Sequence, residues 1–210
     1  MKSQRGFTLV EMLVSTGIMV LIMTIVFAGY PRFKARSTLS AAAREIGLLV
    51  RETQVFGLAV KSFSDTDTAP IYPPYGIHLA EGTGSKREII MFADLPSGSQ
   101  LGVYESGDGC GSETTECIRR LTLGGAIAIS KFCVMSGGGD GVEATEYCSD
   151  SEMGINQMNV TFRRPDPEAV IVVDDLSERY NGAKIYLHSS REPSEERVVR
   201  IWITGQISIQ

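Results

Sequence analysis

The sequence holds few of the residues and motifs that carry out chemistry. Its only two histidines, His78 and His188, fall in stretches that favour β-strands, where structural histidines outnumber catalytic and metal-binding ones. No Gly-x-Ser-x-Gly, His-Glu-x-x-His or P-loop motif occurs. We therefore expect no catalytic residue, no metal site, no cofactor and no enzymatic activity.

The chain also lacks an excess of positive charge. It contains 20 Lys and Arg against 25 Asp and Glu, which gives a formal net charge of −5. Broad binding to nucleic acid depends on cations that neutralise phosphates, so this balance makes a nucleic-acid partner unlikely. We expect the two basic doublets, at 119–120 and 163–164, to be surface charges that pair with acidic neighbours.

The sequence has acidic residues that could bind calcium, but they do not follow a known calcium-binding motif. Two acidic loops, residues 64–67 and 138–141, contain carboxylates, but neither follows the EF-hand pattern. We expect both loops to be solvated turns.

The feature that stands out is an apolar run over residues 7–30, which follows a short leader that contains Lys2 and Arg5. The run is long enough to cross a membrane as a helix. The leader cations favour a cytoplasmic N-terminus, although cations at 32, 34 and 36 weaken the asymmetry. A secretory signal is cut after its apolar core. Here Gly6 precedes the core, so a cut at Gly6 would leave the anchor on the mature protein.

Glu11 is the only charged residue in this run. A carboxylate in the middle of a membrane span costs about 2.5–3.5 kcal/mol on insertion scales and usually marks function. One interpretation places Glu11 near the headgroups, where it snorkels. The other pairs it with the amino group that Phe7 would gain after leader removal, on a neighbouring subunit, which requires close geometry.

The string Lys-Ser-Gln-Arg-Gly6 followed by Phe7-Thr-Leu-Val-Glu11 resembles the class III signal of type IV pilins and pseudopilins. The resemblance implies that prepilin peptidase cuts after Gly6 and methylates Phe7, and that Glu11 acts in assembly. It also implies an inner-membrane protein with a single span and its C-terminal domain outside the cytoplasm. Its expected partners are prepilin peptidase, other pilin or pseudopilin subunits and an inner-membrane assembly platform.

The cysteines are few, and all of them lie in the part that would be exported. They are Cys110, Cys117, Cys133 and Cys148. An even number outside the cytoplasm indicates disulfides, and four cysteines allow three pairings. We favour pairing between sequence neighbours; zinc is the alternative, but short Cys-x2–4-Cys spacings are lacking.

Apolar residues continue at helical spacing over 35–61, which predicts an interrupted helix from Thr8 to Val60, roughly 80 Å long. Pro31 should bend or loosen this helix, and Gly17 and Gly29 weaken it further. Membrane helices often tolerate such residues. The resemblance to pilins implies local loss of helix order here on assembly.

After a loop at 62–74, short β-type runs alternate with turn residues. The expected strands cover 75–79, 88–93, 100–104, 118–123, 126–134, 159–163, 169–173, 183–188, 197–204 and 206–209. The run 198–203 has the composition of a buried strand, and 204–206 that of a hairpin turn.

The predicted fold is therefore α+β, with a long N-terminal helix packed on a C-terminal antiparallel, sandwich-like β domain, as in pilins. We divide the chain into a leader (1–6), a transmembrane and assembly helix (7–33), its amphipathic continuation (34–61) and an exported β domain (62–210).

A narrower resemblance rests on the segment 162–169, the Val-Val-Arg-Ile-Trp-Ile run and the final Gly205-Gln-Ile-Ser-Ile209. These resemble H-type minor pseudopilins of type II secretion and related minor pilins. The chain departs twice from that pattern: Pro167-Glu168 replaces a glycine turn, and Gln206 replaces an arginine. Some relatives bind DNA through basic residues near the last hairpin, which Gln206 does not supply.

The expected function is that of a structural subunit in a type IV pilus or a type II secretion pseudopilus, and the large cysteine-containing domain favours a minor subunit. The alternatives are a DNA-binding minor pilin for natural transformation and a major pilin.

Overall fold

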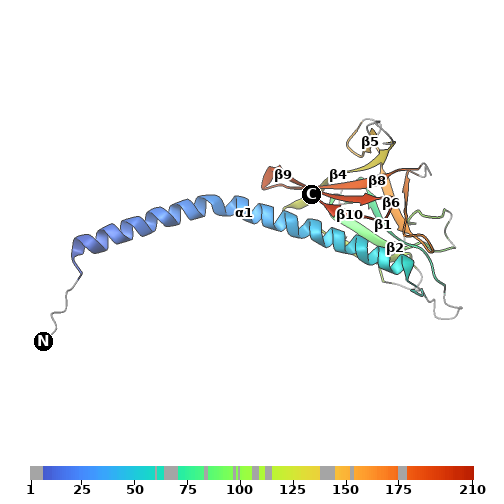
Figure 1. Cartoon of the computed structure of the whole chain (residues 1–210), viewed down its shortest axis with the longest axis horizontal. Helices are drawn as coiled ribbons and strands as arrows, with labels where there is room; N and C mark the ends of the chain where they lie inside the picture. The colour runs from blue at the N-terminus through green and yellow to red at the C-terminus, as the bar shows by residue number, and fades with distance from the viewer. Residues whose placement is uncertain are drawn as a thin grey trace. The chain divides into compact units, whose positions relative to one another are not determined.

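A computed structural model describes residues 7–59, 61–63, 71–82, 85–96, 98, 100–105, 109–111, 115–137, 145–151, 154–174 and 179–210. Within these residues the chain forms one long α-helix followed by a β domain (Figure 1). It divides into two compact units, Met1–Thr38 and Leu39–Gln210.

The helix α1 (Leu9–Leu58) runs through both units. It contains Pro31 without a break, so the predicted interruption is not present. A proline removes one backbone donor, while the neighbouring turns keep theirs. A role for Gly17, Gly29 and Pro31 in local loss of helix order stays a prediction.

The second unit contains two five-stranded antiparallel sheets, which confirms the predicted α+β class. The first has the order β3-β2-β1-β6-β7, with β1 (Tyr75–Ala80), β2 (Glu88–Ala93), β3 (Cys117–Thr122), β6 (Gln157–Phe162) and β7 (Ala169–Val173). The second has the order β10-β9-β8-β4-β5, with β4 (Ile127–Ser136), β5 (Thr145–Cys148), β8 (Gly182–Ser189), β9 (Glu192–Trp202) and β10 (Ile207–Ile209). A short 3-10 turn, η1 (Ser85–Arg87), precedes β2.

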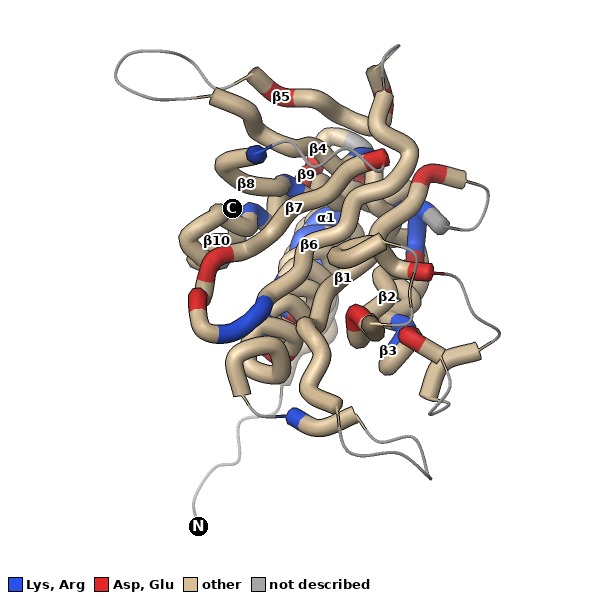
Figure 2. Tube along the Cα trace, turned by 90° about the vertical axis from the view of Figure 1, so that its right-hand side faces the viewer, with Lys and Arg blue, Asp and Glu red and all other residues tan. Residues whose placement is uncertain are grey.

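The core of this unit joins the helix and both sheets in one apolar cluster. The part of α1 after Leu39 contributes one stripe, which includes Ile46 and Val50, while β8 and β9 contribute alternate residues such as Ile185 and Val199. Outside this core, acidic and basic residues are interspersed along the loops and strands (Figure 2). The amphipathic second half of the helix therefore packs on strands, as its periodicity predicted.

The expected strand at 100–104 is wrong. Its backbone is held by side chains instead: Gly102 N donates to Asp94 Oδ2 over 3.0 Å, and Tyr104 N donates to Asn159 Oδ1 over 3.2 Å. Gly102 has φ +81°, a left-handed conformation that interrupts a strand. One of the side chains that satisfy this loop, Asp94, comes from the same loop, and the other, Asn159, comes from β6.

The strand β9 differs from the prediction in its burial. It begins at Glu192, and only Val199 and Ile201 are buried, while Val198, Arg200 and Trp202 on its other face remain half-buried. One face of the second sheet is therefore open, and the run 198–203 is not a strand buried on both faces.

The hairpin between β9 and β10 turns as predicted. Gly205 has φ +80°, and Trp202 N donates to Gln206 O over 2.8 Å. The strand β5 was missed because it is short and polar; it pairs with β4, with Cys148 opposite Cys133.

Gly57 allows the helix to approach the β6 backbone. A Cβ placed on Gly57 would meet the Phe162 carbonyl oxygen and lie 2.9 Å from its carbon. We expect Gly57→Ala to lower the free energy of unfolding by about 1–3 kcal/mol in urea denaturation of the full chain in detergent micelles. The Phe162 carbonyl belongs to the backbone of a strand, so it cannot move aside as a flexible side chain can.

Gly47→Ala is the matched control, because its Cβ would face only the flexible end of Ile209, at 3.0 Å. We expect this variant to be unchanged or up to about 1 kcal/mol more stable, since alanine favours the helix. Equal behaviour of the two variants would contradict the packing argument.

Candidate functional site

The first turn of α1 is capped by a hydroxyl that belongs to the signal string itself. Glu11 N donates to Thr8 Oγ1 over 3.3 Å, and Met12 N donates to Thr8 O over 3.2 Å. Thr8 is therefore the N-cap and Glu11 lies at the third helical position, the spacing of a capping box. The helix dipole also favours an acid in this first turn. Our sequence reasoning missed this role, although Thr-x-x-Glu signals it.

The two residues of the predicted assembly pair are both exposed. Phe7 keeps 78% of its surface accessible, and Glu11 is exposed as well. Within the described part of the chain, no side chain pairs with the Glu11 carboxylate. Gly6, the predicted cleavage residue, lies outside the described residues. The single chain thus leaves Glu11 available to a group from outside it.

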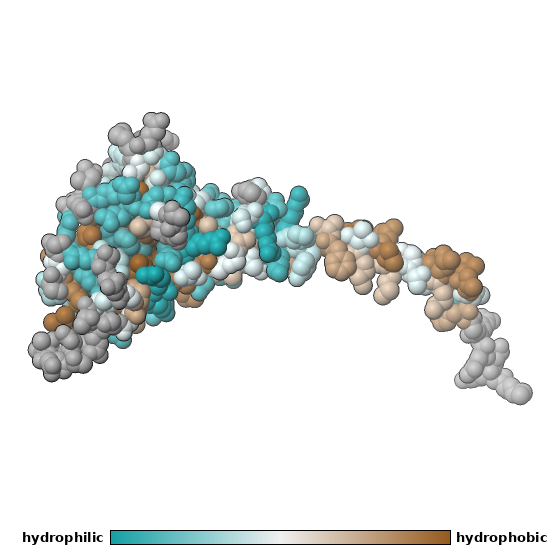
Figure 3. Space-filling view, turned by 180° about the vertical axis from the view of Figure 1, so that it is seen from behind, coloured by the Kyte–Doolittle hydropathy of each residue, from teal (hydrophilic) through white to brown (hydrophobic). Residues whose placement is uncertain are grey.

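The first unit exposes a continuous apolar surface on all sides of the helix. The exposed large apolar residues in this unit are Phe7, Leu9, Val10, Met12, Leu13, Val14, Ile18, Met19, Val20, Leu21, Ile22, Met23, Ile25, Val26, Phe27, Tyr30 and Phe33. Figure 3 shows this part of the helix in the colours of hydrophobic residues. Such a surface marks a site of membrane or protein contact. By length and composition, α1 can cross a membrane.

The hydroxyl groups of Ser15, Thr16 and Thr24 in this apolar segment are satisfied within the helix. Thr16 donates to Met12 O over 2.9 Å, and Thr24 donates to Val20 O over 2.8 Å. Ser15 likewise donates to Met12 O over 3.1 Å. These bonds remove the cost of placing free hydroxyls in lipid or in a dry helix bundle.

One face of the same segment is hollowed. An open apolar groove of about 500 Å³ is lined by Thr16, Met19, Val20, Met23, Thr24 and Phe27. Gly17 and Gly29 have nothing within 4 Å of where a Cβ would stand. The segment therefore offers depressions into which side chains of a neighbouring helix can pack.

The cysteines form two disulfides between sequence neighbours, Cys110–Cys117 and Cys133–Cys148. Cys133, Cys148 and Glu146 place potential ligand atoms within 4.8 Å of one another. Their sulfur atoms are bonded to each other, however, and Glu146 accepts hydrogen bonds from Lys184 and from Tyr186 Oη. All three groups are thus engaged with partners of their own.

His78 is a buried structural histidine. Its Nδ1 lies 2.8 Å from Asn159 Oδ1, and its ring lies 4.9 Å from the Tyr104 ring. Burial lowers the pKa of His78, and the Asn159 contact only partly opposes this. His188, the other histidine, is half-buried in β8.

We expect His78 to make the fold less stable in mild acid. The unfolded imidazole binds a proton below about pH 6.5, whereas the folded one stays neutral to lower pH. Neutral His78 therefore costs the fold no stability above about pH 6.5, and the free energy of unfolding decreases as the pH falls through that value. Thermal unfolding of the wild type and of His78→Gln at about pH 7.5 and about pH 5.5 tests this. The fall in midpoint should be larger for the wild type; equal falls would contradict it.

Two buried carboxylates, Asp94 and Glu116, hold the loop between β2 and β3. Glu116 accepts hydrogen bonds from Leu95 N at 3.2 Å and Glu105 N at 2.7 Å. Burial raises the pKa of both carboxyls, against the opposing effect of these backbone donors. Asp94 Oδ1 has no partner among the described residues. Sequence patterns did not reveal this cluster, because its members lie at irregular spacings along one long loop and meet only when the loop folds back on itself.

One basic doublet is paired as expected. Arg119 lies 2.6 Å from Glu52 of α1, and Arg120 lies 3.5 Å from Glu88 of β2. In the other doublet, Arg164 lies over the Tyr72 ring at 5.7 Å. The acidic loops 64–67 and 138–141 lie outside the described residues.

The N-terminal segment of the chain, from the leader into the exposed helix, matches a known family model. Residues 1–27 match the model of the prokaryotic N-terminal methylation motif. The chain carries a prepilin-type signal. No curated protein and no solved structure matches the chain. The prepilin-type signal, together with the apolar helix, supports a pilin-like or pseudopilin subunit and indicates anchoring in a membrane.

Proposed function

We propose that the protein is a minor structural subunit of a type IV pilus or of a type II secretion pseudopilus. In this proposal, prepilin peptidase cuts after Gly6 and methylates Phe7. Before assembly, the processed subunit is anchored in the inner membrane, with its β unit outside the cytoplasm. An assembly platform then packs it against other pilin or pseudopilin subunits.

The observation that carries the proposal is the coincidence of the prepilin-type signal with a fully exposed apolar helix. The helix hydroxyls are satisfied internally, so the segment can lie in lipid or among other helices without new polar partners. Assembly moves the segment out of lipid and into contact with the helices of other subunits. The one charged side chain of this segment, the Glu11 carboxylate, has no side-chain partner among the described residues, and the amine of a processed Phe7 on a neighbouring subunit is complementary to it.

The same features favour a structural role over catalysis, since pilins are structural proteins. Minor rather than major status rests on the large second unit with its two disulfides. Of the two basic doublets, one is held by Glu52 and Glu88, which makes it less available to the phosphates that the DNA-binding alternative requires.

The experiment is quantitative mass spectrometry of filaments sheared from cells that produce the protein. We expect the protein in the filament fraction at a small molar ratio to the most abundant subunit. Equal or greater abundance would make it a major pilin. Absence from filaments in cells that assemble them would overturn the structural proposal.

A further inference from the structure

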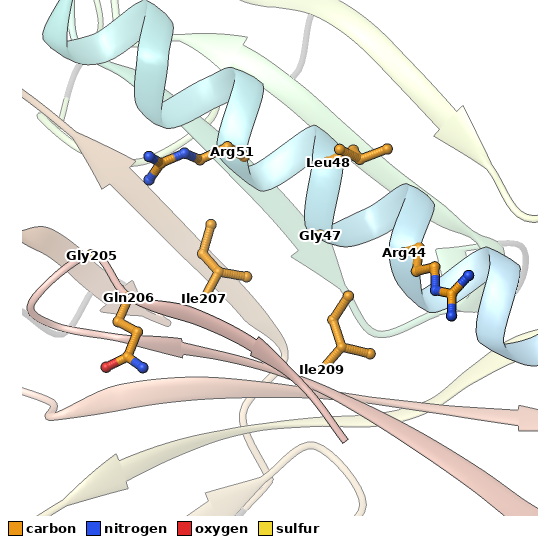
Figure 4. A pocket seen from close by; sticks show the side chains of 8 residues that line it. All are labelled: Arg44, Gly47, Leu48, Arg51, Gly205, Gln206, Ile207 and Ile209. Carbon is orange, nitrogen blue, oxygen red and sulfur yellow. The ribbon is translucent and has the colours of Figure 1, made fainter.

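An open groove runs between the second half of α1 and the last strand of the second sheet. It has a volume of about 570 Å³ and is lined by Arg44, Gly47, Leu48, Arg51, Gly205, Gln206, Ile207 and Ile209. In Figure 4, Ile207 and Ile209 extend from β10 toward the helix, which carries the two arginines and Leu48. All of these residues belong to the second unit.

The strand side of this groove is a sheet edge. Among the described strands, β10 is the last of its sheet and pairs only with β9. Trp202 N donates to Gln206 O, and Val198 and Gln210 exchange two hydrogen bonds of 3.0 and 2.9 Å. Because bonding alternates along an antiparallel pair, the N–H and C=O groups of Ile207 and Ile209 point away from β9. These groups form a template for one more strand.

The helix side of the groove is apolar in the middle and basic at both ends. Leu48 is 70% exposed and Ile209 is 42% exposed, so both apolar side chains remain accessible to a partner. Arg44 has no carboxylate partner within the described part of the chain, and the hydrogen bond of Arg51 goes to neutral Gln54 at 2.5 Å. In a chain of net charge −5, these two arginines are a local positive site.

The end of the groove is held in place before any partner arrives. Gln54 is buried, accepts the bond from Arg51 and donates to Gly205 O over 3.1 Å. The turn into β10 is thereby fixed to the helix, which lowers the ordering cost of binding.

We propose that this groove binds an extended acidic segment of a neighbouring filament subunit, which adds a strand to β10. The inference rests on the proposed function, since it assigns a partner surface to the same subunit. Arg44 and Arg51 are about 10 Å apart along the helix, with Leu48 between them. A strand with acids at positions i and i+4 and an apolar residue at i+2 spans about 13 Å. Its two carboxylates thus reach both arginines while the apolar side chain contacts Leu48.

The test is fluorescence polarisation with the full chain in detergent micelles and a labelled peptide, acetyl-Thr-Glu-Thr-Val-Thr-Glu-Thr-amide. A second peptide carries Lys at both Glu positions. We expect it to bind at least about tenfold more weakly. Two further peptides are N-methylated on one or the other alternating set of residues. Only one set faces β10, so one of the two should lose binding and the other keep it.

The variant R44E/R51E should reverse the preference between the Glu and Lys peptides. R164E/R191E makes the same charge change at two exposed arginines outside the groove and serves as the control that keeps the original preference. The proposal is overturned by absence of binding at about 1 mM, by equal binding of both peptides, by N-methylation that has no effect, or by indifference to R44E/R51E.

A duplex DNA oligonucleotide is the remaining probe. The groove is a nucleic-acid site, and the proposal is wrong, if two results are obtained together. The first is that DNA binds the wild type and binds R44E/R51E more weakly, and the second is that no peptide binds. Peptide binding needs neither leader removal nor filaments. A chain that binds the peptide but is absent from filaments would therefore count against the proposed function alone.

Discussion

Gly6→Val leaves the leader on the protein. A β-branched side chain at the residue before the cut should block prepilin peptidase, so the membrane-extracted variant retains residues 1–6 and an unmethylated Phe7. We expect processing to fall from near completion to below detection in intact-mass spectra. Ser3→Val, a substitution of the same kind inside the leader, should be processed normally. A processed Gly6→Val product would show that the cleavage site is elsewhere.

Glu11→Ala leaves processing intact and removes the protein from filaments. Loss of one partner of a buried ion pair costs about 3–5 kcal/mol, at least about a hundredfold in an equilibrium. The variant should accumulate in the membrane in its processed form and be depleted in the sheared filament fraction. Immunoblots of the two fractions measure this ratio.

The capping arrangement at the start of α1 supplies the control for that result. Glu11→Gln removes the charge but keeps a residue that suits the third position of a capping box. Thr8→Ala removes the cap and keeps the charge. If Glu11 pairs with the Phe7 amine, Glu11→Gln is depleted as strongly as Glu11→Ala, and Thr8→Ala is incorporated. If Glu11 acts only through the helix start, Thr8→Ala is depleted and Glu11→Gln is incorporated, which would contradict the pairing.

The helix and most strands could be predicted because their patterns are local. The apolar stripe after Leu39 and the alternation around Val160 and Phe162 are visible in the sequence, and both lie in the core. The helix α1 continues through Pro31, and the loosening expected there stays a prediction. The run 198–203 was overinterpreted as buried because its composition does not reveal that one face of the sheet is open.

The loop at 100–104 and the groove could not be predicted, for the same physical reason. Gly102 and Tyr104 take their hydrogen bonds from side chains at positions 94 and 159. The groove joins residues 44–51 of the helix to residues 205–209 of the last hairpin. Each depends on contacts across the fold, which no single window of sequence contains. The signal itself could be recognised because its residues are contiguous.

The central claim is that the exposed helix belongs to a subunit whose leader is removed at Gly6. The intact mass of the protein extracted from membranes of a host with active prepilin peptidase tests it most directly, with and without reduction. We expect the mass of residues 7–210 plus one methyl group, with a gain of two hydrogens per disulfide on reduction. An unprocessed chain in that host would contradict it and leave a β domain on a simple membrane anchor.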